Sequence, residues 1–209
     1  MIRQPVAAFR AAAIGLALGL AAPAAADPIV QSVESHRNDQ GEIDRTGGGL
    51  VHRATGYVFP LTLADMPAVN TITYAPGIAS VAYGFDTKDG RVFLALFIYP
   101  AEIPLAEDAA NVEEALLQNM PGKAIDRPAA APPPPAAARE RWFDSTVGKT
   151  EVVTGYRIVQ DGKHMIKVRL TMPKAGGQAT LDRGWRALAA VRWSIAPPAA
   201  SGAASAASE

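Results

Sequence analysis

The chain has 209 residues, with 20 Lys and Arg, 20 Asp and Glu, three His and no Cys. A formal net charge of zero argues against nucleic acid as a partner, because phosphate binding needs a concentrated basic surface. The lack of Cys excludes disulfides, thiolate metal ligands and a cysteine nucleophile. The length fits one globular domain with irregular ends.

Residues 1–26 have the pattern of a secretory signal peptide. Arg3 and Arg10 precede an uncharged run at residues 11–22, and the small residues 24–26 follow it. The run is too short for a membrane-spanning helix, which needs about 20 apolar residues. We therefore expect cleavage after Ala26 and a mature chain without a transmembrane segment, located in the periplasm or secreted.

The mature chain divides into a polar lead, one domain and a tail. Residues 27–49 are polar and rich in Gly, and we expect an irregular lead. Residues 50–195 form the single domain, which carries a Pro/Ala-rich insertion at 127–139 that we expect to be an unstructured spacer. Residues 196–209 have small side chains with little to bury, so we expect a disordered tail.

Within the domain, hydrophobic periodicity predicts a strand, two hairpins and two helices. Alternation over short apolar runs bounded by turn residues indicates the strands, and apolar residues at spacings of three and four indicate the helices. In chain order these elements are a strand at 51–59, a hairpin of 78–85 with 91–99, a helix at 105–120, a hairpin of 150–159 with 163–172, and a helix at 179–194. Since residues 92–98 are apolar on both faces, their strand should be central and covered on both sides.

Each hairpin contains an Asp-Gly turn that predicts its register. A three-residue loop with Gly last gives a type I turn plus a bulge. That loop would pair Phe85 with Phe93, and Tyr156 with Ile166. In the second hairpin it would leave a basic face, opposite the apolar one, that consists of Arg157, Lys163, Lys167 and Arg169.

The order of elements predicts an α+β fold, an antiparallel sheet of about five or six strands with two helices packed on it. The segment Gly56-Tyr57-Val58-Phe59-Pro60, followed by hairpin, helix, hairpin and helix, resembles PsbP-like α+β domains over residues 56–195. The whole chain is also similar to uncharacterised small exported proteins of alphaproteobacteria. That resemblance implies a fold and no activity.

Two catalytic motifs, the phosphate-binding P-loop and the serine nucleophile elbow, are incomplete in this sequence. Gly148-Lys149-Thr150 matches the end of a P-loop, but Phe143 stands where the loop needs a glycine, so no phosphate cradle forms. No Ser lies in the G-x-S-x-G setting of a nucleophile elbow. A catalytic triad assembled from distant residues stays open.

The sequence gives no metal or cofactor site. His36, His52 and His164 stand apart, without HExxH spacing. An acidic cluster around Gly41, made of Asp39, Glu42 and Asp44, does not follow the EF-hand spacing and fits a solvated turn better than a calcium site. We expect no catalytic, cofactor-binding or metal residues.

These observations favour an exported, non-enzymatic domain that binds an unknown envelope protein or small ligand. Its candidate partner-binding face is the basic one, Arg157, Lys163, Lys167 and Arg169, which could meet an acidic partner. A solvated sheet face is the other interpretation of that charge pattern. The alternative function is a periplasmic hydrolase that uses His52 or His164 with a dispersed acid.

Overall fold

The computed structural model describes residues 42–195. The expected signal peptide, most of the polar lead and the expected tail lie outside the described residues, as do His36 and Asp39. Nothing in the structure bears on what was expected of residues 1–41 and 196–209.

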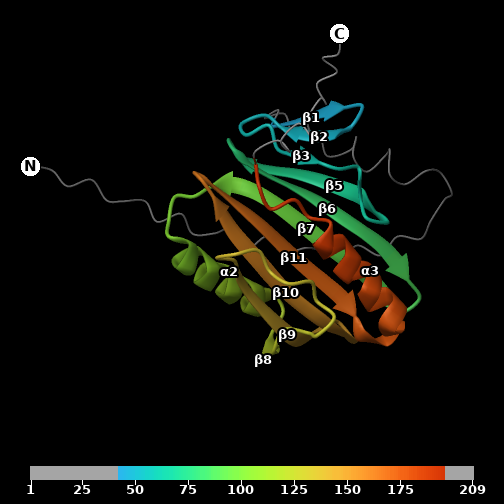
Figure 1. Cartoon of the computed structure of the whole chain (residues 1–209). Coiled ribbons are helices and arrows are strands. Elements are labelled where there is room, and N and C mark those ends of the chain that lie inside the picture. The colour runs from blue at the N-terminus through green and yellow to red at the C-terminus, as the bar shows by residue number, and fades with distance from the viewer. Residues whose placement is uncertain (1–41, 196–209) are drawn as a thin grey trace, which may run out of the picture.

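The main element is a curled antiparallel sheet of eight strands (Figure 1). Every neighbouring pair in it is antiparallel. In spatial order the strands are β4 (Thr62–Leu63), β5 (Met66–Ala75), β6 (Ile78–Thr87), β7 (Gly90–Pro100), β11 (His164–Pro173), β10 (Thr150–Asp161), β9 (Arg139–Val147) and β8 (Gly122–Ile125). The strand predicted over residues 92–98 is part of β7 and is central, as expected.

A smaller three-stranded sheet lies beside β5 at one end of the molecule (Figure 1). It consists of β1 (Ile43–Thr46), β2 (Gly49–His52) and β3 (Val58–Phe59). The Tyr57 hydroxyl donates to the Arg192 carbonyl at 2.7 Å, and the Tyr83 hydroxyl donates to the Pro60 carbonyl at 3.0 Å. These two bonds tie the small sheet to the rest of the domain.

The two long helices pack on opposite faces of the large sheet. Helix α2 (Leu105–Asn119) packs on β9 and β10, and α3 (Gly177–Ala189) follows the short 3-10 helix η1 (Lys174–Gly176) and packs on β7 and β11. We call the two sides of the sheet the α2 face and the α3 face. Both predicted helices exist, although the second ends at Ala189 rather than near residue 194.

Each face has its own hydrophobic core. The larger core joins the α3 face to α3 and the small sheet, and its members include Phe59, Val81, Leu94, Leu96, Val168, Trp142, Trp185 and Leu188. The smaller core lies under α2 and contains Ala109, Leu116, Phe143, Tyr156, Ile158 and Met165. Two covered faces explain why strands of this sheet carry apolar residues on both sides.

The α+β prediction with five or six strands is wrong, since the fold is mostly β with an eight-stranded and a three-stranded sheet. Strand β5 gave little sequence signal because Pro67 and two bulges interrupt its alternation. Strand β9 begins with the charged residues Arg139, Glu140 and Arg141, so it does not look like a strand with a buried face. Strand β1 lies inside the lead that we expected to be irregular.

The predicted hairpin registers are also wrong, the first by one residue and the second by three. Phe85 pairs with Val92, and Tyr156 pairs with Arg169. The loops have two residues rather than three, and in the second one Gly162 has φ 58°. A two-residue turn with a left-handed first position matches the twist of the strands. The sequence pattern disfavours this register, because it mixes apolar and basic residues on each face.

The proline-rich insertion is an ordered strap rather than a free spacer. It crosses the α3 face in front of β10 (Figure 1). Ala131 is buried in the larger core, and the Pro132 and Pro133 carbonyls accept hydrogen bonds from Arg157. Extended prolines leave their carbonyls unpaired, which makes them available to a buried guanidinium.

Candidate functional site

The four predicted basic residues do not share one face. The structure brings only Lys167 and Arg169 together, on the α2 face of β11, across from Ile158 and Tyr156. Lys163 is exposed in the β10–β11 turn. Arg157 lies on the α3 face and is 1% exposed.

Arg157 has a structural role in the strap contact. Its guanidinium pairs with Glu140, at 2.9 Å from Nε and 2.8 Å from an Nη atom to the same carboxylate oxygen. The other contacts are the carbonyls of Pro132 at 2.7 Å and Pro133 at 3.3 Å, and the Trp193 ring at 5.8 Å. A guanidinium enclosed in this way offers nothing to a partner.

Lys167 and Arg169 belong to a surface that α2 leaves uncovered. Helix α2 packs over β9 and β10, and the α2 face of β5, β6 and β7 extends beyond it. In the strand pairing Lys167 neighbours Phe97, and Arg169 neighbours Ala95. We call this surface the bare half; its members are Ile72, Tyr74, Phe93, Phe97, Lys167 and Arg169.

Aromatic and small side chains form the apolar part of the bare half. Tyr74 is 38% exposed and its ring stacks on that of Phe97 at 6.1 Å. Ser80, Ala82 and Ala95 are buried beneath their larger neighbours. Sequence analysis missed Tyr74 because it missed β5, so no pattern placed that ring beside Phe97.

The two cations of the bare half form no ion pair among the described residues. No carboxylate there lies within 4 Å of either one. The Lys167 ammonium lies instead 4.4 Å from the centre of the Phe97 ring and 5.1 Å from that of Tyr99. Burial lowers the pKa of Lys167 to about 8, with Asp108 acting in the opposite direction, and burial also lowers the pKa of Arg169. Both charges are therefore held where water solvates them poorly.

Replacing Lys167 with methionine should raise the free energy of unfolding at pH 7 by about 1 kcal/mol, because the charged amine is desolvated without an ion pair. The folded pKa of Lys167, about 8, lies below its ordinary 10.5. The unfolded chain thus binds more protons between these values, and wild-type stability rises with pH there. The advantage of Lys167→Met should shrink across this window in urea titrations. An unchanged difference from pH 7 to pH 10 would contradict the prediction.

Helix α2 borders the bare half with acidic residues only. Its four acids are Glu107, Asp108, Glu113 and Glu114, and it has no Lys or Arg. Asp108 accepts a hydrogen bond from the Tyr99 hydroxyl at 2.7 Å, and Glu113 accepts one from Tyr156 at 3.3 Å. Burial raises the pKa of Tyr99, and the proximity of Asp108 raises it further.

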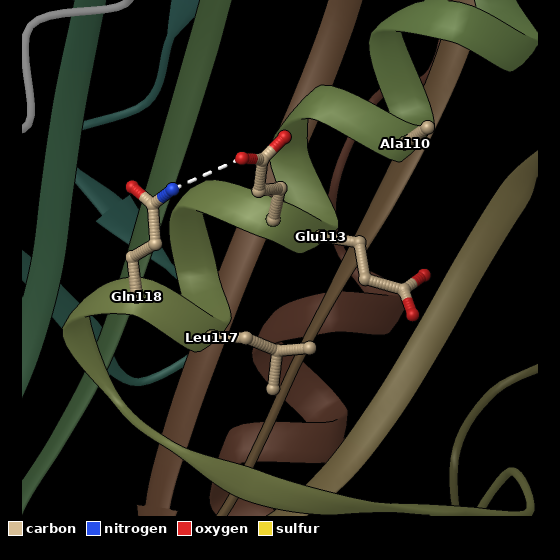
Figure 2. Close-up of a pocket in the computed structure, with 5 residues that line it drawn as sticks. Ala110, Glu113, Leu117 and Gln118 are labelled. Carbon is tan, nitrogen blue, oxygen red and sulfur yellow. Dashed lines mark hydrogen bonds between the residues drawn. The ribbon is translucent and has the colours of Figure 1, made fainter.

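The outer side of α2 carries a shallow hollow that is open to solvent (Figure 2). Its lining is Ala110, Glu113, Glu114, Leu117 and Gln118. In Figure 2 a dashed line marks the hydrogen bond that the Gln118 amide donates to Glu114, at 3.0 Å. A second open hollow lies near the β6–β7 and β9–β10 turns, lined by residues that include Asp89, Lys149 and Lys174.

The structure places His52, one of the two candidate catalytic histidines, in the interior. His52 is fully buried; its Nδ1 lies 2.9 Å from the Thr55 hydroxyl, and its Nε2 lies 3.9 Å from a Glu42 oxygen. Burial lowers the pKa of His52, and His164 lies near enough to lower it further. The Thr55 hydroxyl also accepts a hydrogen bond from the Tyr57 amide, which is the geometry of a turn.

The remaining motifs have local roles. Gly148 and Lys149 form the turn between β9 and β10, where Gly148 has φ 62°. Asp44 pairs with Arg53 across the small sheet. Among residues 42–195 no group of three His, Asp or Glu side chains is placed to hold a metal ion.

Comparisons of the chain with protein-family models, curated proteins and solved structures found no match. The resemblance to small exported proteins stays a prediction. In the part of the chain that the structure describes, no helix is both long and apolar enough to cross a membrane.

Proposed function

We propose that the mature chain is an exported, non-enzymatic domain that binds a protein of the cell envelope through the bare half. The observation that carries the proposal is the pair of unpaired, desolvated cations, Lys167 and Arg169, beside the exposed ring of Tyr74. Arginine and aromatic side chains are the residue types that dominate the energy of protein interfaces. The export rests on the leader pattern of residues 1–26.

A protein partner fits this surface better than a small ligand. Small ligands are usually enclosed by concave sites that bury most of their surface. The hollows described above are shallow and lie away from Lys167 and Arg169. A flat face can still bury enough area against another protein, and its cations would then gain acidic partners.

The test compares two equally exposed apolar residues. Tyr74 on the bare half and Val58 on β3 are both 38% exposed. Tagged mature chain would be incubated with periplasmic extract at several salt concentrations. We expect Tyr74→Ser combined with Arg169→Ala to lose a protein that wild type and Val58→Ser both retain. Equal retention by all three, or no retention by a wild type that is monomeric, would contradict the proposal.

The hydrolase alternative has one favourable observation, the contact of His52 with the Thr55 hydroxyl and the nearby Glu42. A nucleophile and base at this distance could act together. However, the imidazole is fully enclosed, so a substrate has no access to it in this conformation. The alternative predicts ester or amide hydrolysis that His52→Asn abolishes and Lys163→Met, at an exposed site, leaves unchanged. Equal rates for both variants would exclude it.

A further inference from the structure

Helix α2 has apolar residues on two sides. The side that packs on the sheet consists of Leu105, Ala109, Val112 and Leu116. Ala110 is exposed on the outer side, and Leu117 is half-buried at the edge of the core beneath the helix; both line the open hollow with Glu113 and Glu114 (Figure 2). Apolar surface of α2 therefore meets solvent beside the exposed Glu114.

We propose that the partner of the bare half is a second copy of this chain, and that α2 of each copy covers the bare half of the other. The inference rests on the proposed function, because it names the protein that binds there. The two surfaces needed for this contact, an apolar acidic helix and an aromatic basic sheet, are both present on the α2 face.

Opposite charges on α2 and on the bare half favour a second copy of the chain as the partner. Glu114 is exposed, and its hydrogen-bond partner within the chain is the Gln118 amide. Arg169 has no carboxylate within 4 Å among the described residues, although it is half-buried. Contact between copies would bring acids of α2 toward the unpaired cations, and each desolvated charge would gain an opposite one.

Symmetry makes the contact self-complementary. Helix α2 covers the β9–β10 part of the face, and the β5–β7 part is uncovered. A two-fold rotation therefore places each helix on the other copy's uncovered strands. The same contact then forms twice, and the assembly closes as a dimer. The result is a sandwich in which two sheets enclose two helices.

The same arrangement disfavours an anionic membrane as the occupant. Lys167 and Arg169 alone would attract such a surface. Helix α2 stands on the same face with four acids and no base, so it would meet the membrane at the same time and be repelled. Vesicle binding is therefore an informative outcome of the test.

Charge reversal and its rescue test the dimer. The mature chain would be run by size-exclusion chromatography with light scattering over a wide range of concentrations. We expect a dimer for wild type, a dissociation constant raised at least about tenfold by Glu114→Arg or by Arg169→Glu, and recovery in the double variant. Matched controls are Glu151→Arg and Arg45→Glu, both exposed and away from the α2 face, which should stay dimeric. Thermal unfolding of each variant would show that it is folded, and Leu117→Asp gives a second disruption outside the charge pair.

The outcomes separate this inference from the proposed function. A wild-type monomer at every concentration, or dimers that the reversals leave intact, would overturn the second copy as partner. If that monomer retains another protein that Tyr74→Ser with Arg169→Ala loses, the bare half is a binding face for a different partner. If it retains none, both proposals fail. Binding of the monomer to phosphatidylglycerol vesicles but not phosphatidylcholine vesicles would also overturn the dimer.

Discussion

Replacing Arg157 with methionine should lower the free energy of unfolding by about 3 kcal/mol, although the sequence places this residue in a surface-like basic pattern. The change leaves Glu140, 16% exposed, without its close cation and deprives the Pro132 and Pro133 carbonyls of a donor. Removing one partner of a buried ion pair costs about 3 to 5 kcal/mol, since the remaining charge stays desolvated. Arg127, 3.8 Å from Glu140, compensates for part of the loss.

Urea denaturation of wild type, Arg157→Met and Lys163→Met would measure the effect. Lys163 is the matched control, because it is a cation of the same hairpin that is exposed and makes no ion pair among the described residues. The strap should also become sensitive to trypsin at its flanking residues Arg127 and Arg139 in the Arg157 variant alone. Similar stability of the two variants would show that the strap does not depend on Arg157.

This prediction shows why the basic face could not be read correctly from sequence. Alternation along a strand assigns residues to faces only when the register of the hairpin is known. In this sheet α2 covers one face and α3 the other, so both faces accept apolar residues and the pattern leaves the register open. The two-residue turn shifts the second hairpin by three residues, so Lys167 lies opposite Ile158 on the α2 face, whereas Arg157 lies opposite Val168 on the α3 face.

Local signals were sufficient for other elements. Helix α2 begins at the predicted Leu105 and ends one residue early, because its acidic first turn and the following Pro121-Gly122 define both ends. The four hairpin strands were located to within about two residues for the same kind of reason. These features depend on neighbours in the chain and not on the tertiary fold.

The candidate site depends on contacts that no local pattern reports. Tyr74 lies near the end of the bulged strand β5, and the pairing of β5 with β6 decides on which face of the sheet its side chain lies. Its ring stacks there on Phe97 of β7. The sequence analysis did not single out Ala110 or Leu117 of α2, because their partial exposure has a meaning only beside the uncovered strands. Sequence analysis could find the cations, whereas only the fold shows which of them lack partners.

Gly155→Ala tests how tightly the sheet is packed and should lower the free energy of unfolding by about 3 kcal/mol. Gly155 lies on the α3 face of β10, across from Trp142 on β9. A Cβ there would overlap the Trp142 ring and lie 2.5 Å from the Arg141 carbonyl oxygen. Trp142 is 2% exposed and packs edge-to-face on Trp185 of α3 at 5.1 Å, so its ring has no room to move. Overpacking of this kind costs about 1 to 3 kcal/mol, with more expected when backbone is also met.

The measurement is urea denaturation followed by tryptophan fluorescence, with Gly48→Ala as the control. A Cβ at Gly48 meets nothing within 4 Å, and its φ is not in the left-handed region, so its stability should change little. Because α3 is held through Trp185, the Gly155 variant should also lose protection from proteolysis in α3 before the rest of the domain unfolds. A loss under about 0.5 kcal/mol would mean that Trp142 can shift and that the sheet and α3 are less rigidly linked than this packing implies.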